Sequence, residues 1–547
     1  MKTLSKISMA ASLAALAATS GSAQNFGESC GCPPLNSRTA VTLNNASSPL
    51  LVNANNEFIG TVTLTCNNTY TANTKLYVTN GNDLNIQPGT VIKWVDNSGI
   101  NSNALIVTRG AKIIADGTES CPIIMTSVSD PLDGSYAVTN RGKWGGLIIL
   151  GKAFNNVAST DQKDANGTVG SSTSITGTNQ IGLIEGLAAG DSRHYYGQGV
   201  GNEVNNDNSG ILRHVSLRHG GELLGTANEI NGLTLGGVGS GTIIDHVEAT
   251  SNLDDAFEFF GGTVNAKYLV AMHCDDDYID YDQGYTGKIQ FFYGLQGPDN
   301  SGGAANEGDN GIEGDGDDGP GNPYAKSNPS IYNATIISRV PSGDESLELR
   351  REASGKIHNS IFASARSGLS LADAAYTSWS ANTGMDIQNC TFQFRADQTD
   401  VDPTSSFKRV RVSTVLGTFT NASAADYTKF TTDGNLTTAA GSLMDATFAI
   451  LPLTSNTVTD RVNPIPAYGA VAAQTTLLPP ADGFFTAAKY RGAFEPGAAS
   501  WLPRYSVARK IGSDKAVYTC VGDLNGDGLV NSADFSTFVG RFGGNCN

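Results

Sequence analysis

Short apolar-polar-apolar triplets recur along the middle of the chain. They lie at residues 233–235, 257–259, 279–281, 347–349 and 369–371. Two pairs of them, 257–259 with 279–281 and 347–349 with 369–371, are separated by 22 residues. Each triplet has the alternation of a short strand with one buried face. A repeat of about this length is typical of a solenoid, in which each turn of the chain stacks on the one before.

Glycines follow the triplets at matching places, namely Gly239, Gly261, Gly262 and Gly284. A backbone that turns a corner favours a residue without a Cβ atom at such places. Upstream, residues 84–86 and 105–107 repeat the pattern with a spacing of 21. We therefore predict an all-β fold, a right-handed parallel β-helix with about 22 residues per rung.

The length of 547 residues fits one solenoid, because a solenoid grows by adding rungs. The expected segments are a signal peptide at 1–23, an N-terminal segment or cap at 24–75, the β-helix at 76–512 and a small module at 513–547. Two insertions are expected within the β-helix, at 294–330 and at 400–478. The first is rich in Gly and Asp and is interpreted as an excursion that cannot bury a core. The second is interpreted as a lateral insertion or partial cap.

The first residues predict export. Lys2 and Lys6 precede an apolar run at 9–18, and small residues at 21–23 favour cleavage before Gln24. No other segment approaches the roughly 18 apolar residues of a membrane span. We expect a secreted protein, extracellular or on the cell surface of a bacterium. The net charge of -17 argues against nucleic acid as a partner.

Eight cysteines in an exported chain predict disulfide bonds. Cys520 with Cys546 is the pair that we expect first, and Cys66 with Cys121 is the second. Cys274 is expected to be buried or disulfide-bonded.

Several segments resemble a widespread family of exported bacterial β-helix proteins. They include LNIQPGTVIKW, ALIVTRGAKIIADGTESCPIIMTS, KWGGLIILGKAF, GILRHVSLRHGG and FFTAAKYRGAFEPG, and the resemblance runs from about Leu76 to about Trp501. It implies the same β-helix fold. Since that family has no settled activity, the resemblance leaves the chemistry open.

The C-terminal stretch GDLNGDGLVNSAD has the spacing of an EF-hand-type calcium loop. The expected metal ligands are Asp523, Asn525, Asp527, the carbonyl of Leu529, Asn531 and Asp534. Gly528 stands at the sixth place, where the loop turns sharply. The stretch resembles one repeat of a type I dockerin, a module that carries two such repeats and docks on cohesins. The resemblance implies bound Ca²⁺ and a protein partner at this end, and the alternative is a metal-free turn.

Paired aspartates are the best candidate site on the solenoid. Asp254 and Asp255 precede one triplet, and Asp276 and Asp277 precede the next. If residues 22 apart stack on adjacent rungs, their carboxylates come within about 5 Å of each other. Like charges so close require a bridging cation, a shared proton or backbone N–H groups. Glu258 over Asp280 is expected to form a second stacked pair.

Three interpretations of the aspartates remain open. They bind calcium between corners, they act as a catalytic carboxylate pair on a polysaccharide, or they cap turn backbone. The stretch CDDDYID resembles the double-aspartate rung of polygalacturonases, but the N-T-D, G-H-G and R-I-K motifs are absent. Lys288, Arg350 and Arg351 are the cations that a lyase would need, and they are more often partners of acidic rungs.

Two functions follow as expectations. The first is a secreted calcium-binding β-helix protein that acts as an extracellular or cell-surface scaffold in contact with polysaccharide. The second is a polysaccharide-degrading enzyme, a glycoside hydrolase or lyase, with a dockerin-like tail. His214 and His219 are five residues apart, so they are not expected to form one metal site by themselves.

Overall fold

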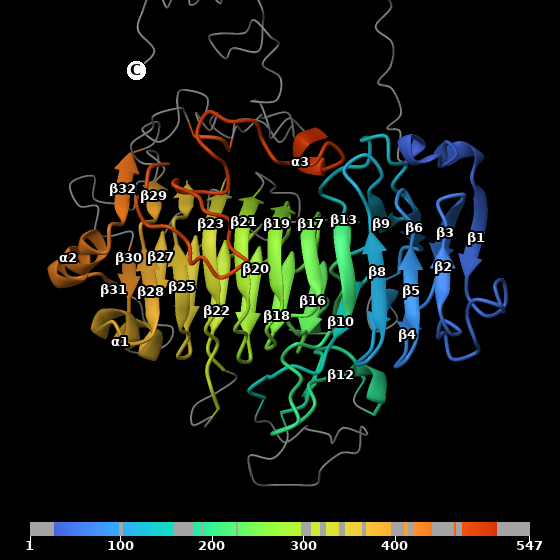
Figure 1. Ribbon diagram of the computed structural model, residues 1–547, viewed down its shortest axis with the longest axis horizontal. Helices are drawn as coiled ribbons and strands as arrows, with labels where there is room; N and C mark the ends of the chain where they lie inside the picture. The colour runs from blue at the N-terminus through green and yellow to red at the C-terminus, as the bar shows by residue number, and fades with distance from the viewer. Residues whose placement is uncertain are drawn as a thin grey trace, which may run out of the picture.

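The computed structural model describes most of the chain between residues 27 and 510. The described residues are 27–97, 102–157, 180–188, 190–225, 228–296, 308–317, 324–338, 345–363, 368–394, 410–413, 420–439, 464–466 and 473–510. Strands stack side by side along the long axis of the molecule (Figure 1). The predicted signal peptide and the calcium loop at 523–534 lie outside the described residues.

The described strands form two long sheets, and neighbouring rungs within each are parallel. The 11-stranded sheet contains β4 (Leu76–Val78), β7 (Ala104–Val107), β10 (Gly146–Leu150), β16 (Leu233–Gly236), β18 (Phe257–Phe260), β20 (Ile279–Asp282), β22 (Ile312–Asp315), β24 (Leu347–Arg350), β27 (Leu369–Leu371), β30 (Val410–Val412) and the antiparallel β31 (Thr420–Asn421).

The 17-stranded sheet supplies the remaining walls of the solenoid. Its strands are β1 (Thr39–Leu43), β2 (Val62–Leu64), β3 (Asn68–Ala72), β5 (Asp83–Ile86), β6 (Val91–Trp94), β8 (Lys112–Asp116), β9 (Ile123–Ser127), β13 (Gly210–Arg218), β17 (Ile243–Thr250), β19 (Asn265–Met272), β21 (Lys288–Leu295), β23 (Ser330–Ile337), β25 (Gly355–His358), β26 (Ile361–Ala363), β28 (Met385–Gln388), β29 (Thr391–Phe394) and β32 (Leu436–Ala439).

Small elements decorate the stack. They are the hairpins β11 (Gly182–Leu183) with β12 (Tyr195–Tyr196) and β14 (Leu223–Gly225) with β15 (Asn228–Glu229), the helices α1 (Asp373–Ala381), α2 (Ala424–Thr432) and α3 (Val507–Lys510), and the 3-10 turns η1 (Glu28–Cys30), η2 (Leu35–Ser37) and η4 (Ser192–His194). Figure 1 places α1 and α2 at the C-terminal end of the stack.

The predicted parallel β-helix is confirmed, and so is the stacking of the triplets. Glu258 of β18 pairs with Asp280 of β20, while Phe257 and Phe259 point into the apolar core. The constant period is wrong, however. The step from β16 to β18 is 24 residues, at Leu233↔Phe257. The step from β20 to β22 is 33 residues, and the step from β22 to β24 is 35 residues. Loops of unequal length enter at the corners, so only the strands keep the register.

One corner of the solenoid carries a non-glycine residue with positive φ on each of seven rungs. These residues, which we call the corner column, are His214, His246, Tyr268, Phe291, Asn333, Asn359 and Asn389, with φ from 49° to 61°. This left-handed conformation costs free energy for residues with a Cβ. Stacked rings offset the cost, because the centroids of His214 and His246 are 4.6 Å apart and those of His246 and Tyr268 are 4.4 Å apart.

A C-terminal segment, residues 473–510, runs back along this corner; we call it the strap (Figure 1, red). Asn333 donates a hydrogen bond to the carbonyl of Tyr490 at 2.9 Å. Further along, the hydroxyl of Tyr505 donates to the carbonyl of His246 at 2.9 Å. Phe494 and Leu502 of the strap pack with Val270, Tyr293 and their neighbours in a separate apolar cluster. The strap therefore binds several rungs together.

Three predicted boundaries need correction. Residues 24–75 are not only a cap, since β1, β2 and β3 already belong to the 17-stranded sheet. The predicted excursion at 294–330 contains β22, whose side chains are buried and which pairs with β20 and β24. The predicted insertion at 400–478 contains β30 and β32, which extend the two sheets, together with α2. The apolar positions of these short strands lie between polar segments, so the sequence pattern did not indicate that these residues form strands.

The predicted pairing of Cys66 with Cys121 is wrong. Cys121 is bonded to Cys30, and Cys66 is bonded to Cys32. Both disulfides fasten the N-terminal segment to the first rungs. Cys30 and Cys32 are only two residues apart, so the sequence does not indicate which distant cysteine each of them is bonded to. Cys274 is buried, and Cys520 and Cys546 lie outside the described residues. Among the helices that the structure describes, none has the length and apolar character needed to span a bilayer.

Candidate functional site

A ladder of polar side chains stands at the corner just before the 11-stranded sheet. Its members, one on each rung, are Asn231, Asp255, Asp277, Asn310 and Glu345. Asp255 Oδ1 accepts a hydrogen bond from the backbone N–H of Asp277 at 2.8 Å, and Asp277 Oδ1 accepts one from that of Asn310 at 2.6 Å. The turn-capping interpretation is therefore confirmed for one oxygen of each of these two aspartates. Their second oxygens are available for other chemistry.

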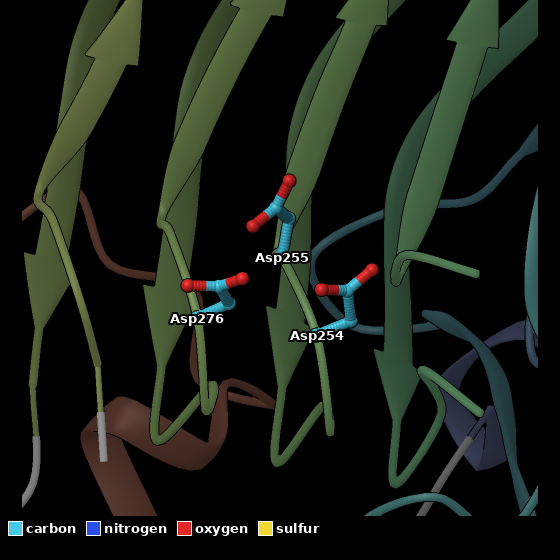
Figure 2. A group of neighbouring side chains, drawn as sticks. All are labelled: Asp254, Asp255 and Asp276. Atoms are coloured by element: carbon cyan, nitrogen blue, oxygen red, sulfur yellow. The ribbon is translucent and has the colours of Figure 1, made fainter. Parts of the chain in front are cut away.

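Asp254, Asp255 and Asp276 form the outer triad of the site. One carboxylate oxygen from each lies within 4.8 Å of the others. Figure 2 shows the three side chains at the starts of adjacent rungs, with Asp276 directed toward Asp254 and Asp255. Asp254 and Asp255 are 7% and 6% exposed, whereas Asp276 is exposed. The triad is thus a buried pair of carboxylates with one carboxylate at the surface.

Asp277, the fourth predicted residue, belongs to neighbouring groups rather than to the outer triad. It joins Asp276 and Asp309 in one group and Asp280 and Glu313 in another, with the same 4.8 Å limit. Sequence reasoning missed Asp309 and Glu313, because the spacing on this rung differs from 22. The alternation of Ile312, Glu313 and Gly314 was the available signal for Glu313.

The acidic row continues on the outer face of the 11-stranded sheet. We use this name for Glu258, Asp280, Glu313 and Glu348, which pair in that order across β18, β20, β22 and β24. Asp255 connects the row to the outer triad, because it also lies within 4.8 Å of Glu258 and Asp280. Alternation along each strand directs these carboxylates away from the core.

Burial and mutual repulsion shift the ionisation of the row. Burial raises the pKa well above the ordinary value, and neighbouring carboxylates raise it further, for Asp255, Glu258, Asp277 and Asp280. Burial also raises the pKa of Glu313, to about 8, against the opposing charge of Arg350. The carboxylates cannot all be charged without compensation, so they must hold protons or a cation.

Basic side chains compensate only one end of the row. Arg350 contacts Glu313, and its Nε lies 3.0 Å from Asp315 Oδ1. Arg351 is 2.7 Å from Asp315, and Lys288 is 2.5 Å from Asp482. The three cations named from sequence are therefore partners of acidic side chains, as the simpler interpretation expected. Glu258 and Asp280 have no ion pair with a basic side chain among the described residues.

Two buried oxygen atoms near the row have no hydrogen-bond partner among the described residues. They are Asp280 Oδ1 and Asn231 Oδ1, and the amide group of Asn231 donates to Glu258 through its nitrogen. The donors around the site are carboxylate and amide oxygens, the ligand set of Ca²⁺ or Mg²⁺ rather than of zinc or copper. The residues present thus fit a hard divalent cation.

The histidines lie elsewhere. His214 belongs to the corner column, where its ring stacks on His246. His219 is hydrogen-bonded through Nδ1 to the carbonyl of Asn140 at 2.6 Å. Nothing in these contacts brings the two rings together.

Fold and site together define a parallel β-helix with an outward-facing row of carboxylates. A family model described as a pectate-lyase-like β-helix domain matches residues 56–441, and the chain belongs to this family. No curated protein and no solved structure matched the chain. The family relates the fold to polysaccharides, and the chain's own residues must supply the chemistry.

Proposed function

We propose that this protein is an extracellular, calcium-binding scaffold that holds an acidic polysaccharide at the outer triad and the acidic row. The observation that carries the proposal is the outer triad, three carboxylates within 4.8 Å with one of them exposed. Asp254, Asp255 and Asp276 would hold the cation. A Ca²⁺ ion takes six to eight oxygen ligands, so three carboxylates leave places for oxygens of a bound polymer.

The surroundings support binding rather than elimination. A lyase requires a base beside the carboxylate of its substrate, and Arg350, Arg351 and Lys288 are engaged with Asp315 or Asp482. The membership of a pectate-lyase-like β-helix family supports polysaccharide as the partner.

A second candidate function, glycoside hydrolysis, is favoured by one observation. Burial raises the pKa of Glu313 to about 8, and a carboxyl group that keeps its proton near neutral pH can act as a general acid. Asp280 and Asp277 lie within 4.8 Å of Glu313, so a second carboxyl group stands beside the acid. This is the carboxylate pairing that glycosidases use.

The C-terminal module extends the proposal. Asp523, Asn525, Asp527, Leu529, Asn531 and Asp534 would bind a further Ca²⁺ and offer a dockerin-like surface to a protein partner. Export by the segment at 1–23 would bring the protein to a compartment where calcium is abundant.

The test separates the solenoid from the tail. The full chain carrying Asp523→Asn and Asp527→Asn is assayed for calcium by titration calorimetry and for retention of polygalacturonate in affinity gels. Asp276→Asn on this background should abolish calcium-dependent retention, and Asp133→Asn, at an exposed aspartate that belongs to neither the outer triad nor the acidic row, should leave it unchanged. Retention that is equal in EDTA would contradict the cation. Release of reducing ends that is lost in Asp276→Asn or Glu313→Gln would establish the hydrolase instead.

A further inference from the structure

An excursion covers part of the outer face of the 11-stranded sheet. Residues 180–188 and 190–196, which we call the cover, include β11, η4 and β12. Ile184, Leu187 and Tyr196 of the cover are buried against Ile148 and Phe260 of the sheet in one apolar cluster. The outer face is thus apolar and covered over β7 and β10, and acidic from β18 onward.

Polar contacts fix the cover in place. The Tyr77 hydroxyl of β4 lies 3.1 Å from His194 Nε2. The guanidinium of Arg193 lies 3.7 Å from the centre of the Tyr77 ring and pairs with Glu57 at 3.2 Å. The ring of Tyr196 packs on that of Phe260 with centroids 6.1 Å apart. These contacts join the cover to several rungs, so it is a fixed part of the surface.

The cover ends on the first rungs of the acidic row, since Tyr196 packs on Phe260 of β18 and donates a hydrogen bond to Gln283 after β20. A Cβ atom added to Gly236 of β16 would lie 2.8 Å from Tyr196 and 3.1 Å from Ile184, so the cover rests directly on this backbone. Thr234, two residues earlier, is 1% exposed, and Glu258 on the next strand is 5% exposed. Beyond them, Asp280 and Glu348 are partly exposed, while Glu313 between them is 9% exposed. The row is therefore closed at Glu258, and Asp280 and Glu348 are its more accessible members.

Glu185 brings a further carboxylate to the closed end. It follows Ile184 in the cover, and its side chain is partly exposed. Burial raises the pKa of Glu258, and the charge of Glu185 is the largest of the neighbouring charges that raise it further. Asn231, 1% exposed, donates to Glu258 and keeps its Oδ1 without a partner among the described residues. Glu185 thus places a partly exposed carboxylate next to the buried Glu258 and Asn231 at this end.

We propose that the acidic row binds the end of a polysaccharide chain, with the terminal sugar against the cover beside Glu185 and Glu258. The inference rests on the proposed function and names its substrate more closely. A polymer that lies along the row cannot continue past Tyr196 and Ile184, because these side chains rest on the sheet. A terminal sugar carries one free hydroxyl more than an internal one, and carboxylate and amide oxygens accept hydrogen bonds from hydroxyls.

The experiment compares polymer mass with the number of chain ends. Polygalacturonate and the same material cut to about one tenth of its length are titrated into the full chain over the same range of mass concentration and in excess calcium. The cut material has about ten times as many chain ends per unit mass. The inference therefore expects the cut material to saturate the protein at about one tenth of the mass that the uncut material requires. Equal mass at saturation would overturn the inference and leave the proposed function standing, whereas retention of neither material would overturn both. Borohydride-reduced and unsaturated oligomers, used as competitors, then identify which end is bound.

A variant pair tests the role of Glu185. Glu185→Gln should weaken binding of short oligomers by about tenfold, since a hydrogen bond to a charged group is worth about 1.5 kcal/mol and 1.4 kcal/mol is tenfold. Calcium binding at the outer triad should be unchanged in this variant. Glu203→Gln, outside the cover on the same excursion, is the matched control. Equal affinity of Glu185→Gln and the control for oligomers would contradict a terminal sugar at Glu185.

Discussion

The corner column and the acidic row are both stacks with one side chain per rung, yet they are built in opposite ways. The column consists of aromatic and amide side chains, and the strap covers it with hydrogen bonds such as that from Asn333 to Tyr490. The row consists of carboxylates, and Arg350 is engaged at one end of it only. Stacking thus satisfies the polar groups on one wall and concentrates charge on another.

The difference separates a structural surface from the surface that we propose binds a ligand. Left-handed backbone in the column costs free energy, and ring stacking together with the strap offsets it within the chain. Among the described residues, Arg350 offsets the repulsion in the row at one end only, so a proton, a cation or a ligand must supply the offset at the other end. We therefore expect changes in the column to alter stability, and changes in the row to alter binding.

The largest effect is expected at the anchor of the strap. Glu248 Oε1 accepts hydrogen bonds from the backbone N–H groups of Val507 and Ala508 at 2.6 and 3.4 Å, and Oε2 accepts from Ser216 at 2.7 Å. Glu248→Ala removes these bonds from a buried site and leaves the donors of Ser216, Val507 and Ala508 without this acceptor. The free energy of unfolding should fall by about 4 kcal/mol, measured by urea denaturation, because hydrogen bonds to a charged group contribute about 1.5 to 3 kcal/mol each.

Two controls accompany the Glu248 variant. Glu248→Gln keeps an oxygen acceptor and should lose less stability. Glu495→Ala changes an exposed residue of the strap and should have little effect. A loss in Glu248→Ala no larger than that in Glu495→Ala would show that the strap contributes little.

An intermediate effect is expected from pH acting on the row. The pKa values of Asp255, Glu258, Asp280 and Glu313 are raised in the folded protein, that of Glu313 to about 8. Their stabilising contribution is complete below the ordinary carboxyl pKa of about 4 and is lost as the pH rises through the raised values. In EDTA, the unfolding free energy should therefore fall by about 2 kcal/mol between pH 5 and pH 8.

Calcium and one substitution sharpen this pH test. Excess calcium should remove the decline, because the cation replaces the protons. Asp280→Asn should reduce the decline, whereas Asp133→Asn should preserve it. Unfolding curves in EDTA that coincide at pH 5 and pH 8 would argue that the row is compensated in another way.

The smallest effect is expected from one hydroxyl of the strap. Tyr505→Phe removes the hydrogen bond to the carbonyl of His246 and should cost about 1 kcal/mol. Amide hydrogen exchange at 501–510 should become faster. Tyr376→Phe removes another tyrosine hydrogen bond, from Tyr376 of α1 to Asp426 of α2 at 3.0 Å, at the end of the stack away from α3 (Figure 1). It should lower stability without changing exchange at 501–510, and equal exchange in both variants would exclude a local role for Tyr505.

Sequence periodicity revealed the fold because stacking repeats a local pattern. The register of Glu258 with Asp280 follows from the 22-residue spacing. The same reasoning failed where loops change the step, so β22 was taken for part of an excursion. The strap could not be predicted, since its contacts join distant segments with no shared period.

The candidate site was predictable to the same extent. Asp254, Asp255 and Asp276 were brought together as the repeat implied, whereas Asp309 and Glu313 follow a longer step. The cover and Glu185 left no signal, because their position over β16 and β18 depends on tertiary packing alone. Turn capping by Asp255 was an open alternative, and it proved compatible with the triad since each carboxylate has two oxygens.

The backward course of the strap places α3 beside the middle of the stack (Figure 1). Arg491 contacts the carbonyl of Cys390 near the last rungs, while α3 is held by Glu248 of β17 in the middle of the stack. A force applied through α3 would therefore act on the side of the β-helix, at its central rungs. The first and last rungs would not be the first to unfold under such a force. Both ends of the β-helix and the acidic row would remain exposed to solvent.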